Sequence, residues 1–294
     1  MTATRAGFVA IVGEPNVGKS TLLNAMLGEK LAPVSRRPQT TRGVVRGILT
    51  GKTSQIVFLD TPGHHRPYDR LGEWMQQEIE KALESADLVY WMVFPRLPSE
   101  ADRKIAGLLG RSEKPVFLVV NQIDRVSKPE LLPVLEAFAK LGSFREMIPV
   151  SAERREQIPL LLRKTEECLP AGEFLYPPDD ISDQQQRFFV QELIREKIFR
   201  FTGQEVPHAS GVLLEHFKDR SERLVDIRAT IVVEKDSQKA ILIGKGGEKM
   251  KQIGREARQS IEKFLGKKVF LELWVKAVPG WRKDPKMLKA MGCE

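Results

Sequence analysis

Short apolar runs alternate with amphipathic segments over the first 170 residues of the chain. The apolar runs are residues 8–12, 56–59, 116–120 and 147–150. Runs of this length that are apolar throughout are typical of strands buried on both faces of a sheet. The segments with helical spacing are residues 75–84, 100–109, 131–141 and 158–169. This alternation predicts right-handed β-α-β units, and therefore an α/β domain built on a mostly parallel sheet.

The pattern changes at residues 169–180, which are rich in proline and acidic residues and lack periodicity. This composition favours a semi-extended linker that allows limited relative motion. Beyond it, strand-like residues 227–233 and 269–275 flank an amphipathic, basic run at residues 248–265. We therefore divide the chain into a first domain, residues 1–170, a linker, 171–186, a second domain, 187–280, and a basic tail, 281–294.

Length and composition are those of a soluble globular protein. The chain has 294 residues, 41% of them hydrophobic and 29% charged, and this length is comfortable for two domains. The sequence has no stretch of about 18 apolar residues, and its N-terminus runs directly into a core strand. We therefore expect neither a membrane span nor a signal peptide. The two cysteines, Cys168 and Cys293, are far apart, which favours reduced thiols in a cytoplasmic protein.

The basic charge of the chain is concentrated in its C-terminal part. Residues 187–294 contain 23 Lys or Arg and 15 Asp or Glu, a net of +8, whereas residues 1–186 contain 24 of each. Localised basic charge is typical of a surface that meets nucleic acid or another anionic surface. The neutral N-terminal part suits a domain that holds its only polyanion in a preformed pocket.

A glycine-rich segment after the first apolar run carries the strongest chemical signal. It reads Gly13-Glu14-Pro15-Asn16-Val17-Gly18-Lys19-Ser20, and residues 21–27 after it have helical spacing. This is the G-x-x-x-x-G-K-S pattern in its strand–loop–helix context. Backbone N–H groups of such a loop cradle phosphate oxygens, the lysine reaches the β- and γ-phosphates, and the serine hydroxyl binds Mg²⁺. The alternative is an ordinary glycine-rich turn before a helix.

Three further segments follow at the C-terminal ends of predicted strands, in the order and spacing of a GTPase. They are Asp60-Thr61-Pro62-Gly63, Asn121-Gln122-Ile123-Asp124 and Ser151-Ala152-Glu153. Asp60 is placed to hold Mg²⁺ through water, and the N–H of Gly63 to meet the γ-phosphate. The Asp124 carboxylate can accept both N–H groups of guanine, and the backbone of the third segment can meet the guanine carbonyl. Because open α/β sheets bind ligands at this edge, the four segments together predict a GTP site.

With these segments in place, the chain resembles the Era family of bacterial GTPases. Residues 15–24, Gln39-Thr40-Thr41-Arg42 and Asp60-Thr61-Pro62-Gly63 are similar to that family's G1, G2 and G3 motifs. The resemblance implies that switch I spans Gln39–Gly43. It also implies that Thr41, with Thr40 as the alternative, joins Ser20 and Asp60 around Mg²⁺.

Three single residues refine what the resemblance implies for the GTP site. Asn16 matches a P-loop asparagine that holds a monovalent cation in potassium-stimulated relatives, which implies K⁺ stimulation. Gln122 stands where GTPases usually carry a lysine that packs on the guanine ring, so we expect specificity to survive through Asp124 and affinity to be weaker. His64 follows the D-x-x-G glycine, a position from which a side chain can orient the attacking water. The resemblance instead favours His64 as a spectator, so the catalytic group stays unknown, with His64 as its candidate and no arginine finger assigned.

The second half contains a short loop pattern of its own. Ile243-Gly244-Lys245-Gly246-Gly247 gives a G-x-x-G loop, followed by the cations Lys249, Lys251, Arg255 and Arg258. Such a loop between two helices approaches the nucleic-acid backbone and helps to clamp four unstacked nucleotides. The run 187–278 resembles the type II KH domain that completes the Era architecture. The expected fold is therefore a P-loop GTPase domain, with helices on both faces of its sheet, followed by an α+β KH domain. The alternative is a solvated basic helix after an ordinary turn.

Two hypotheses stay open for the tail at residues 279–294. One is a surface helix packed through Trp281, Leu288 and Met291. The other is an extension of the RNA-binding face through its lysines and arginine.

The Era resemblance implies a molecular switch that binds and slowly hydrolyses GTP. Its implied partners are the 3′ region of 16S ribosomal RNA, bound through the KH domain, and the 30S subunit, whose maturation it assists. Its implied cofactors are GTP or GDP with Mg²⁺, and K⁺ as a stimulating ion. We expect a monomer in the cytoplasm with loose association at the inner face of the membrane. Two alternatives remain: an RNA-binding module whose G domain barely hydrolyses GTP, and a membrane-surface signalling GTPase with incidental RNA binding.

Overall fold

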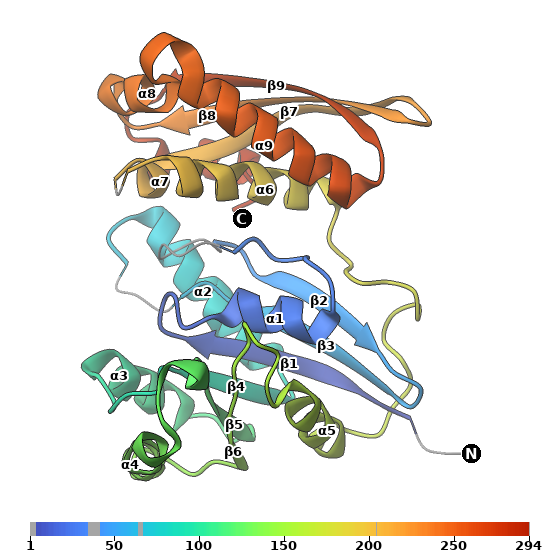
Figure 1. The fold of residues 1–294 in the computed structure, drawn as a ribbon, viewed down its shortest axis with the longest axis vertical. Helices are drawn as coiled ribbons and strands as arrows, with labels where there is room; N and C mark the ends of the chain where they lie inside the picture. The colour runs from blue at the N-terminus through green and yellow to red at the C-terminus, as the bar shows by residue number, and fades with distance from the viewer. Residues whose placement is uncertain (1–3, 35–41, 64–66, 204, 294) are drawn as a thin grey trace. The chain divides into compact units, whose positions relative to one another are not determined.

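The chain contains two compact units in the computed structural model, which describes residues 4–34, 42–63, 67–203 and 205–293 (Figure 1). Of the described residues, the N-terminal unit contains 4–32, 42–63 and 75–183. The C-terminal unit contains 33–34, 67–74, 184–203 and 205–293. Each unit has its own hydrophobic core, as the length of the chain led us to expect.

A sheet with the strand order β2-β3-β1-β4-β5-β6 forms the centre of the N-terminal unit. Its strands are β1 (Arg5–Gly13), β2 (Val45–Thr50), β3 (Ser54–Asp60), β4 (Leu88–Val93), β5 (Val116–Val120) and β6 (Glu146–Pro149). The predicted, mostly parallel sheet is confirmed, since only the edge strand β2 pairs antiparallel with its neighbour among these strands. The apolar runs did not single out β2 or the central strand β4.

Helices cover both faces of this sheet (Figure 1). α1 (Lys19–Leu27) and α5 (Ile158–Cys168) contact each other on one face. α2 (Arg70–Ser85), α3 (Glu100–Leu109) and α4 (Lys128–Ala139) supply apolar side chains to the core on the other face. Side chains alternate between the faces of a strand, and Ala10 and Val12 of β1 accordingly join Ile79 of α2 and Phe138 of α4 in one cluster.

Capping residues explain where two of these helices begin. Ser99 and Asp102 form a reciprocal capping box at the start of α3, and Ser127 and Glu130 form the same arrangement at the start of α4. Each box satisfies backbone N–H groups that a helix start leaves without partners. The predicted bounds of α3 are confirmed, whereas α4 starts three residues earlier than its apolar spacing indicated.

The segment that follows α5 is held against the N-terminal unit by hydrogen bonds. The buried side-chain carbonyl of Gln55, in β3, accepts from the N–H groups of Leu175 at 2.7 Å and Tyr176 at 2.9 Å. Its amide donates to the Tyr176 carbonyl at 2.9 Å. Further along, the Ile181 carbonyl accepts from the N–H of Ile48, in β2, at 2.9 Å. Residues 175–181 therefore form a strap that is held by Gln55 of β3 and Ile48 of β2.

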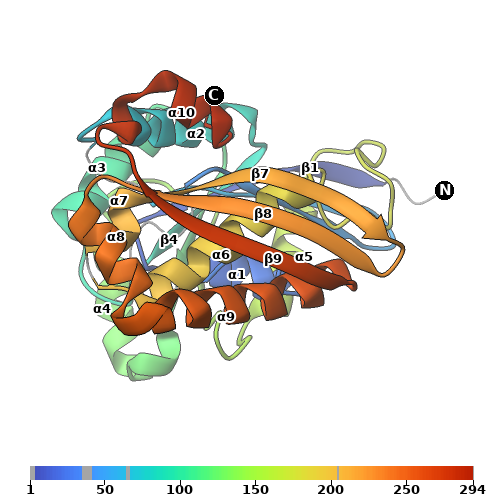
Figure 2. The ribbon, with the colours of Figure 1, turned by 90° about the horizontal axis from the view of Figure 1, so that it is seen from above.

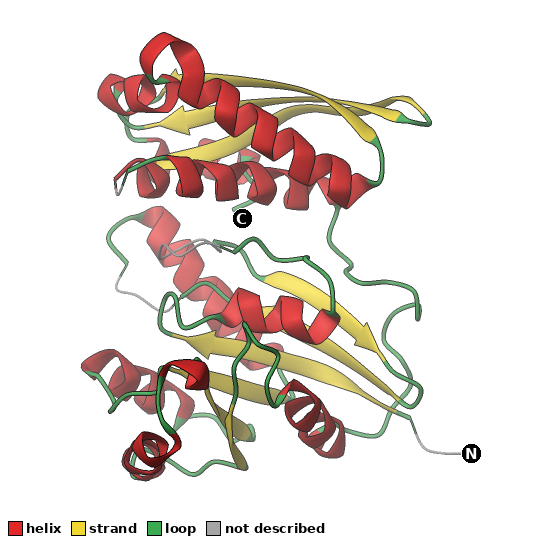
Figure 3. Cartoon of the chain, in the orientation of Figure 1, coloured by secondary structure: helices red, strands yellow, loops and turns green. Residues whose placement is uncertain are grey.

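The C-terminal unit has the element order of an α+β domain with a three-stranded sheet (Figures 2 and 3). Its elements are α6 (Gln186–Phe201), α7 (Glu205–Ala209), β7 (Ser210–Ser221), β8 (Leu224–Val233), α8 (Asp236–Ile243), α9 (Glu248–Leu265) and β9 (Lys268–Ala277). β8 pairs antiparallel with β7 and parallel with β9. Ile194 of α6 and Ile253 and Ile261 of α9 share a core with Ile227 of β8, so both helices cover one face of the sheet.

The tail packs on its own unit through apolar side chains. Trp281 is 1% exposed, and its indole N–H donates to the Ala209 carbonyl at 3.0 Å. The short helix α10 (Pro285–Ala290) begins after Asp284, whose carboxylate accepts from the Lys286 N–H at 2.9 Å. A Cβ at Gly211 in β7 would lie 2.7 Å from the Met291 sulfur, so the glycine leaves room for the tail. The packed helix of the first hypothesis is confirmed, and a role in RNA binding stays a prediction.

Candidate nucleotide site and candidate nucleic-acid interface

The loop between β1 and α1 is shaped by two glycines that touch other segments. Gly13 has φ 157, and a Cβ there would lie 2.3 Å from the Met92 carbonyl oxygen. Gly18 has φ 102, and a Cβ there would lie 2.4 Å from the side-chain nitrogen of Asn121. Asn16 adopts φ 65, which asparagine tolerates better than most residues. The predicted strand–loop–helix context is confirmed, and close packing fixes its glycines.

Lys19 places a buried amine at the base of this loop. Its Nζ donates to the carbonyl oxygens of Gly13 and Glu14, both at 3.1 Å. Burial lowers the pKa of Lys19 to about 8, against the opposing effect of the Asp60 and Glu14 carboxylates. Burial disfavours the charged form of an amine because that form loses its contacts with water. A nearby anion stabilises the charged form again.

A hydroxyl and a carboxylate meet where α1 begins and β3 ends. Ser20 donates to Oδ2 of Asp60 at 2.5 Å, and the Asp60 side chain is fully buried. These are hard oxygen donors of the kind that Mg²⁺ binds, with water and phosphate oxygens completing its shell. Gly63 lies against the loop as well, because a Cβ there would come within 2.9 Å of the Pro15 Cα. The residues present therefore fit a phosphate-bound Mg²⁺.

The side-chain amide of Asn121 joins three segments that are distant in sequence. Its nitrogen donates to the Val17 carbonyl at 2.7 Å, and its oxygen accepts from the Ala152 N–H at 3.0 Å. Next to it, the Ser151 hydroxyl donates to Asp124 at 2.6 Å. This hydrogen bond is the main reason that the pKa of Asp124 is lowered. Asp124 is therefore a carboxylate at neutral pH, able only to accept hydrogen bonds.

Gln122 bends back toward the phosphate loop. It adopts φ 66, and its side-chain nitrogen lies 3.4 Å from the Asn16 carbonyl oxygen. The Arg125 guanidinium donates to the other end of the Gln122 amide at 2.9 Å. A cation thus stands beside the position where a lysine was expected. Sequence reasoning missed Arg125, because no pattern marks the third residue after Gln122.

Several predicted site residues are not covered by the structure. Gln39, Thr40 and Thr41 of switch I, and the candidate catalytic residue His64, lie outside the described residues. Arg42 and Gly43 are described, and both are buried. Ile123 and Glu153 lie in the predicted base-binding segments, and Glu153 is exposed. Thr61 donates its hydroxyl to the Ile11 carbonyl at 2.8 Å, and Pro62 follows it in the chain.

The G-x-x-G loop connects α8 to α9, as predicted. Gly244, Gly246 and Gly247 have φ values of 70, 60 and 78, a region that favours glycine. A Cβ at Gly246 or Gly247 would meet no heavy atom of the described chain within 4 Å, whereas a Cβ at Gly244 would lie 2.8 Å from the Lys249 Cβ. The middle of the loop thus presents open backbone, and its first glycine packs against the start of α9.

The helix after this loop separates apolar from basic side chains. Ile253, Ala257 and Ile261 are buried in the core. Lys245 in the loop is exposed. Three cations on α9 are exposed as well, and in order from the loop they are Lys251, Arg255 and Arg258. In the described part of the chain none of these four lies within 4 Å of a carboxylate. Ile243, the last residue of α8, and Lys249 are half-buried. The result is a basic face that begins at the open loop.

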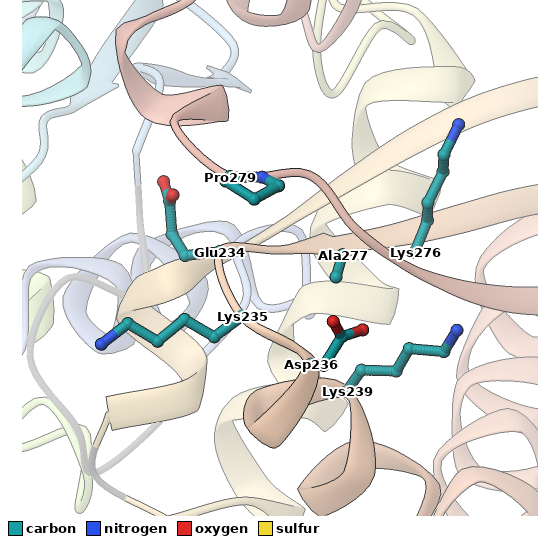
Figure 4. Close-up of a pocket in the computed structure, with 7 residues that line it drawn as sticks. All are labelled: Glu234, Lys235, Asp236, Lys239, Lys276, Ala277 and Pro279. Carbon is teal, nitrogen blue, oxygen red and sulfur yellow. The ribbon is translucent and has the colours of Figure 1, made fainter.

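A hollow of about 560 Å³ lies at the opposite end of α8 from this loop (Figure 4). Its lining residues are Glu234, Lys235, Asp236, Lys239, Lys276, Ala277 and Pro279. Figure 4 shows that Lys239 and Lys276 extend to one side and Lys235 to the other. Sequence reasoning missed this hollow, because its lysines come from two separate elements.

Fold and site together define a P-loop GTPase unit followed by a KH unit. Residues 8–122 match the family described as 50S ribosome-binding GTPase, and residues 205–282 match the KH domain family. The chain is 46% identical over 291 residues to GTPase Era of Trichlorobacter lovleyi, covering 99% of this chain and 98% of that protein. It is 45% identical to GTPase Era of Lactobacillus helveticus, covering 98% and 96%.

Solved structures agree with these relatives. Aquifex aeolicus Era, as a variant bound to GDP and AlF4⁻, has a TM-score of 0.95 and 37% identity, covering 99% of each chain. A complex of Era with MgGDPNP and nucleotides 1506–1542 of 16S ribosomal RNA has the same TM-score, identity and coverage. The chain therefore belongs to the Era family of GTPases. The predicted fold class and the predicted GTPase activity are confirmed.

The lowered pKa of Lys19 predicts how GTP affinity changes with pH. The lysine cation is the form that binds phosphate, and its pKa is about 8 before binding. Below pH 8 the charge is already present, and above pH 8 binding must be accompanied by proton uptake. The Kd for GTP at pH 8.5 should therefore be about fourfold higher than at pH 7.0, measured by equilibrium titration. Lys19→Arg, which does not titrate in this range, should show no such rise; an equal rise in that variant would assign it to another group.

Proposed function

We propose that this chain is a GTP-dependent switch that binds small-subunit ribosomal RNA through its KH unit and assists maturation of the 30S subunit. The observation that carries this proposal is the presence, in one chain, of GTP motifs joined by Asn121 and of an open G-x-x-G loop on a basic face. The solved complex of Era with a 16S ribosomal RNA fragment supports ribosomal RNA as the ligand. Because one chain supplies both sets of residues, we propose that it acts as a monomer.

In the nucleotide site, different segments bind the phosphates, the magnesium ion and the guanine base. The loop Gly13–Ser20 holds the phosphates, with Lys19 as the counter-charge. Ser20 and Asp60, joined by Thr41 of switch I, hold Mg²⁺. The solved Era complex with MgGDPNP supports this ion. The segments 121–124 and 151–153 hold guanine. The group that orients the attacking water stays unassigned, since His64 lies outside the described residues.

Base preference tests the role of Asp124. A site built to pair polar groups rejects analogues that lack them by about 10⁴-fold. Asp124→Asn should therefore shift preference from GTP toward XTP, whose C2 carbonyl can accept from the new amide. Competition between the two nucleotides measures the shift. Glu136→Gln, the same change of charge at an exposed position on α4, should leave the preference for GTP intact. Retained GTP preference in Asp124→Asn would remove Asp124 from the base site.

Asn16 is our candidate for a monovalent-cation ligand beside the phosphates. Its left-handed backbone and the contact of Gln122 with its carbonyl fix the position of this residue in the loop. GTP hydrolysis should then be faster in K⁺ than in Na⁺ at equal ionic strength, and Asn16→Ala should lose most of the difference. Equal rates of the unchanged protein in the two salts would contradict the proposal.

For RNA, we propose a path that starts at the G-x-x-G loop and runs along α8 to the lysine-lined hollow. The open backbone at Gly246 and Gly247 lets a phosphate approach closely. Lys245, Lys249, Lys251 and Arg255 supply positive charge beside the loop, and Lys239 and Lys276 supply it at the hollow. The three lysines of the hollow outnumber its two carboxylates, Glu234 and Asp236, so the hollow as well as the loop attracts the RNA backbone.

Charge reversal at the loop tests this path. Lys245→Asp with Gly246→Asp introduces two carboxylates where the RNA backbone must approach. The fold should persist, because Gly246 has free space around it and aspartate tolerates a φ of 60. RNA affinity, measured with a short single-stranded RNA, should fall by at least about tenfold, and GTP affinity should not change.

The chain offers a matched control at the other end of α9. Gly266 has φ 64 and free space, and the neighbouring Lys268 is exposed. Lys268→Asp with Gly266→Asp makes the same change of charge about 27 Å away along the helix. This control should retain most of its RNA affinity. An equal loss in both double variants would mean that total charge, and not the loop, governs binding.

We also propose that the chain associates loosely with the inner face of the membrane by electrostatic attraction. Its C-terminal part, residues 187–294, carries the net charge of +8, and anionic lipids attract such surfaces by about 1 kcal/mol per cation. In the described part of the chain no helix is both long and apolar enough to cross a bilayer. Co-sedimentation with anionic vesicles that is no greater than with neutral vesicles would contradict this proposal.

A further inference from the structure

Glu14 places a carboxylate inside the phosphate loop, and that carboxylate turns toward the start of α3. Its Oε1 accepts from the Ser99 hydroxyl at 2.6 Å and from the Arg96 guanidinium at 2.8 Å. Ser99 is the residue that caps α3. The backbone carbonyl of the same Glu14 accepts from Lys19. One residue of the phosphate loop is thus tied to Lys19 through its backbone and to α3 through its side chain.

Arg96 stands between two carboxylates at this point. Besides Glu14, its guanidinium lies 3.4 Å from Oδ2 of Asp102. The Ser99 hydroxyl is 2.6 Å from Glu14 and 2.9 Å from Asp102. A serine has a single hydroxyl proton, so it can donate to only one of the two carboxylates. Arg96 therefore supplies the positive charge that allows both acidic side chains to lie so close together.

The surroundings of the two carboxyl groups move their pKa values in opposite directions. Burial alone would raise the pKa of Glu14, but hydrogen bonds from Ser99 and Arg96 outweigh burial and hold the pKa below its usual value. Burial raises the pKa of Asp102, and the nearby Glu14 carboxylate raises it further. In the described part of the chain, Oδ1 of Asp102 is buried and lacks a hydrogen-bond partner. Such surroundings disfavour a charge on Asp102.

A carboxylate in a phosphate loop would oppose a polyanion if its charge were free. The Glu14 carboxylate affects the pKa of Lys19, the amine at the base of the loop, so its field reaches the site that we assign to the phosphates. Interactions between charges are strengthened where water is partly excluded. Some group must therefore compensate Glu14 for the loop to hold GTP well.

We propose that Arg96 is a positioning residue for GTP: it neutralises the Glu14 carboxylate and holds it against α3, away from the phosphates. The proposal rests on the proposed phosphate site. It differs from a merely structural role, in which Arg96 would stabilise the loop or the start of α3 to the same extent for GTP and for GDP. The electrostatic role makes the effect of Arg96 depend on the charge of the bound nucleotide as well as on Glu14.

A double-mutant cycle measured with both GTP and GDP separates the two roles. Arg96→Met should weaken GTP binding about tenfold, measured with fluorescent GTP at low salt, and should weaken GDP binding less, because GDP carries less charge. In a Glu14→Gln background the same Arg96→Met substitution should have an effect of less than twofold. The matched control is Arg103→Met, which removes an exposed cation from α3 itself and should not distinguish GTP from GDP. Thermal unfolding checks that each variant is folded.

Three results would overturn the proposal. Equal weakening by Arg96→Met in both backgrounds would mean that Arg96 acts independently of Glu14, and equal weakening of GTP and GDP binding would mean that it acts through structure. No weakening in either background would mean that it does not act on the site. If Arg96→Met fails to fold, Arg96→Gln takes its place in the same cycle. Lys19→Ala tests the phosphate site separately from the role of Arg96. Unchanged GTP affinity in that variant would refute the site. A severe loss would support the site, and the cycle then decides the role of Arg96.

Discussion

The side-chain amide of Asn121 is the interaction on which the nucleotide site depends. It holds the Val17 carbonyl of the phosphate loop on one side and the Ala152 N–H of the base segment on the other. The partner residues are 104 and 31 positions away in sequence. A single planar group with a donor and an acceptor thus fixes the separation between the phosphate end and the base end. Gly18 lacks a side chain because this amide occupies the space that a Cβ would need.

The sheet makes such a contact possible. β1, β4 and β5 are parallel neighbours, so their carboxyl ends lie at one edge. The Asn121 N–H bonds to the Val93 carbonyl at the end of β4, and a Cβ at Gly13 would strike the Met92 carbonyl on the same strand. The central strand β4 contains no recognisable motif. Its last residues nevertheless position both the phosphate loop and the base segment.

The sequence was sufficient for most of the fold, including the strand-end positions of the segments predicted to bind GTP. The periodicity of α3 predicted its bounds, and the fully apolar runs predicted the parallel strands β1, β3, β5 and β6 but not β4. The contacts of Glu14 could not be predicted in this way. The capping box of Ser99 and Asp102 agrees with that predicted start of α3. Nothing in the spacing of Arg96 and Glu14, however, indicates that they meet at 2.8 Å.

The same limit applies to the second unit. The G-x-x-G loop and its cations were predicted from a contiguous stretch, whereas the hollow at the other end of α8 depends on Lys239 and Lys276 coming together from a helix and a strand. Trp281 was one of the tail's expected packing residues, but its partner, the Ala209 carbonyl, lies 72 positions away. Residues that act through distant partners require the three-dimensional structure.

The strap at residues 175–181 has a consequence for the behaviour of the protein at high concentration. β2 is the last strand on its side of the sheet, and an uncovered edge strand invites pairing with another chain. Ile181 occupies the N–H of Ile48 in this strand, and the strap includes the consecutive prolines Pro177 and Pro178. Proline cannot donate to a strand ladder. The strap therefore ends the sheet with a segment that is poorly suited to recruit a further strand, which protects the GTPase unit against edge-to-edge aggregation.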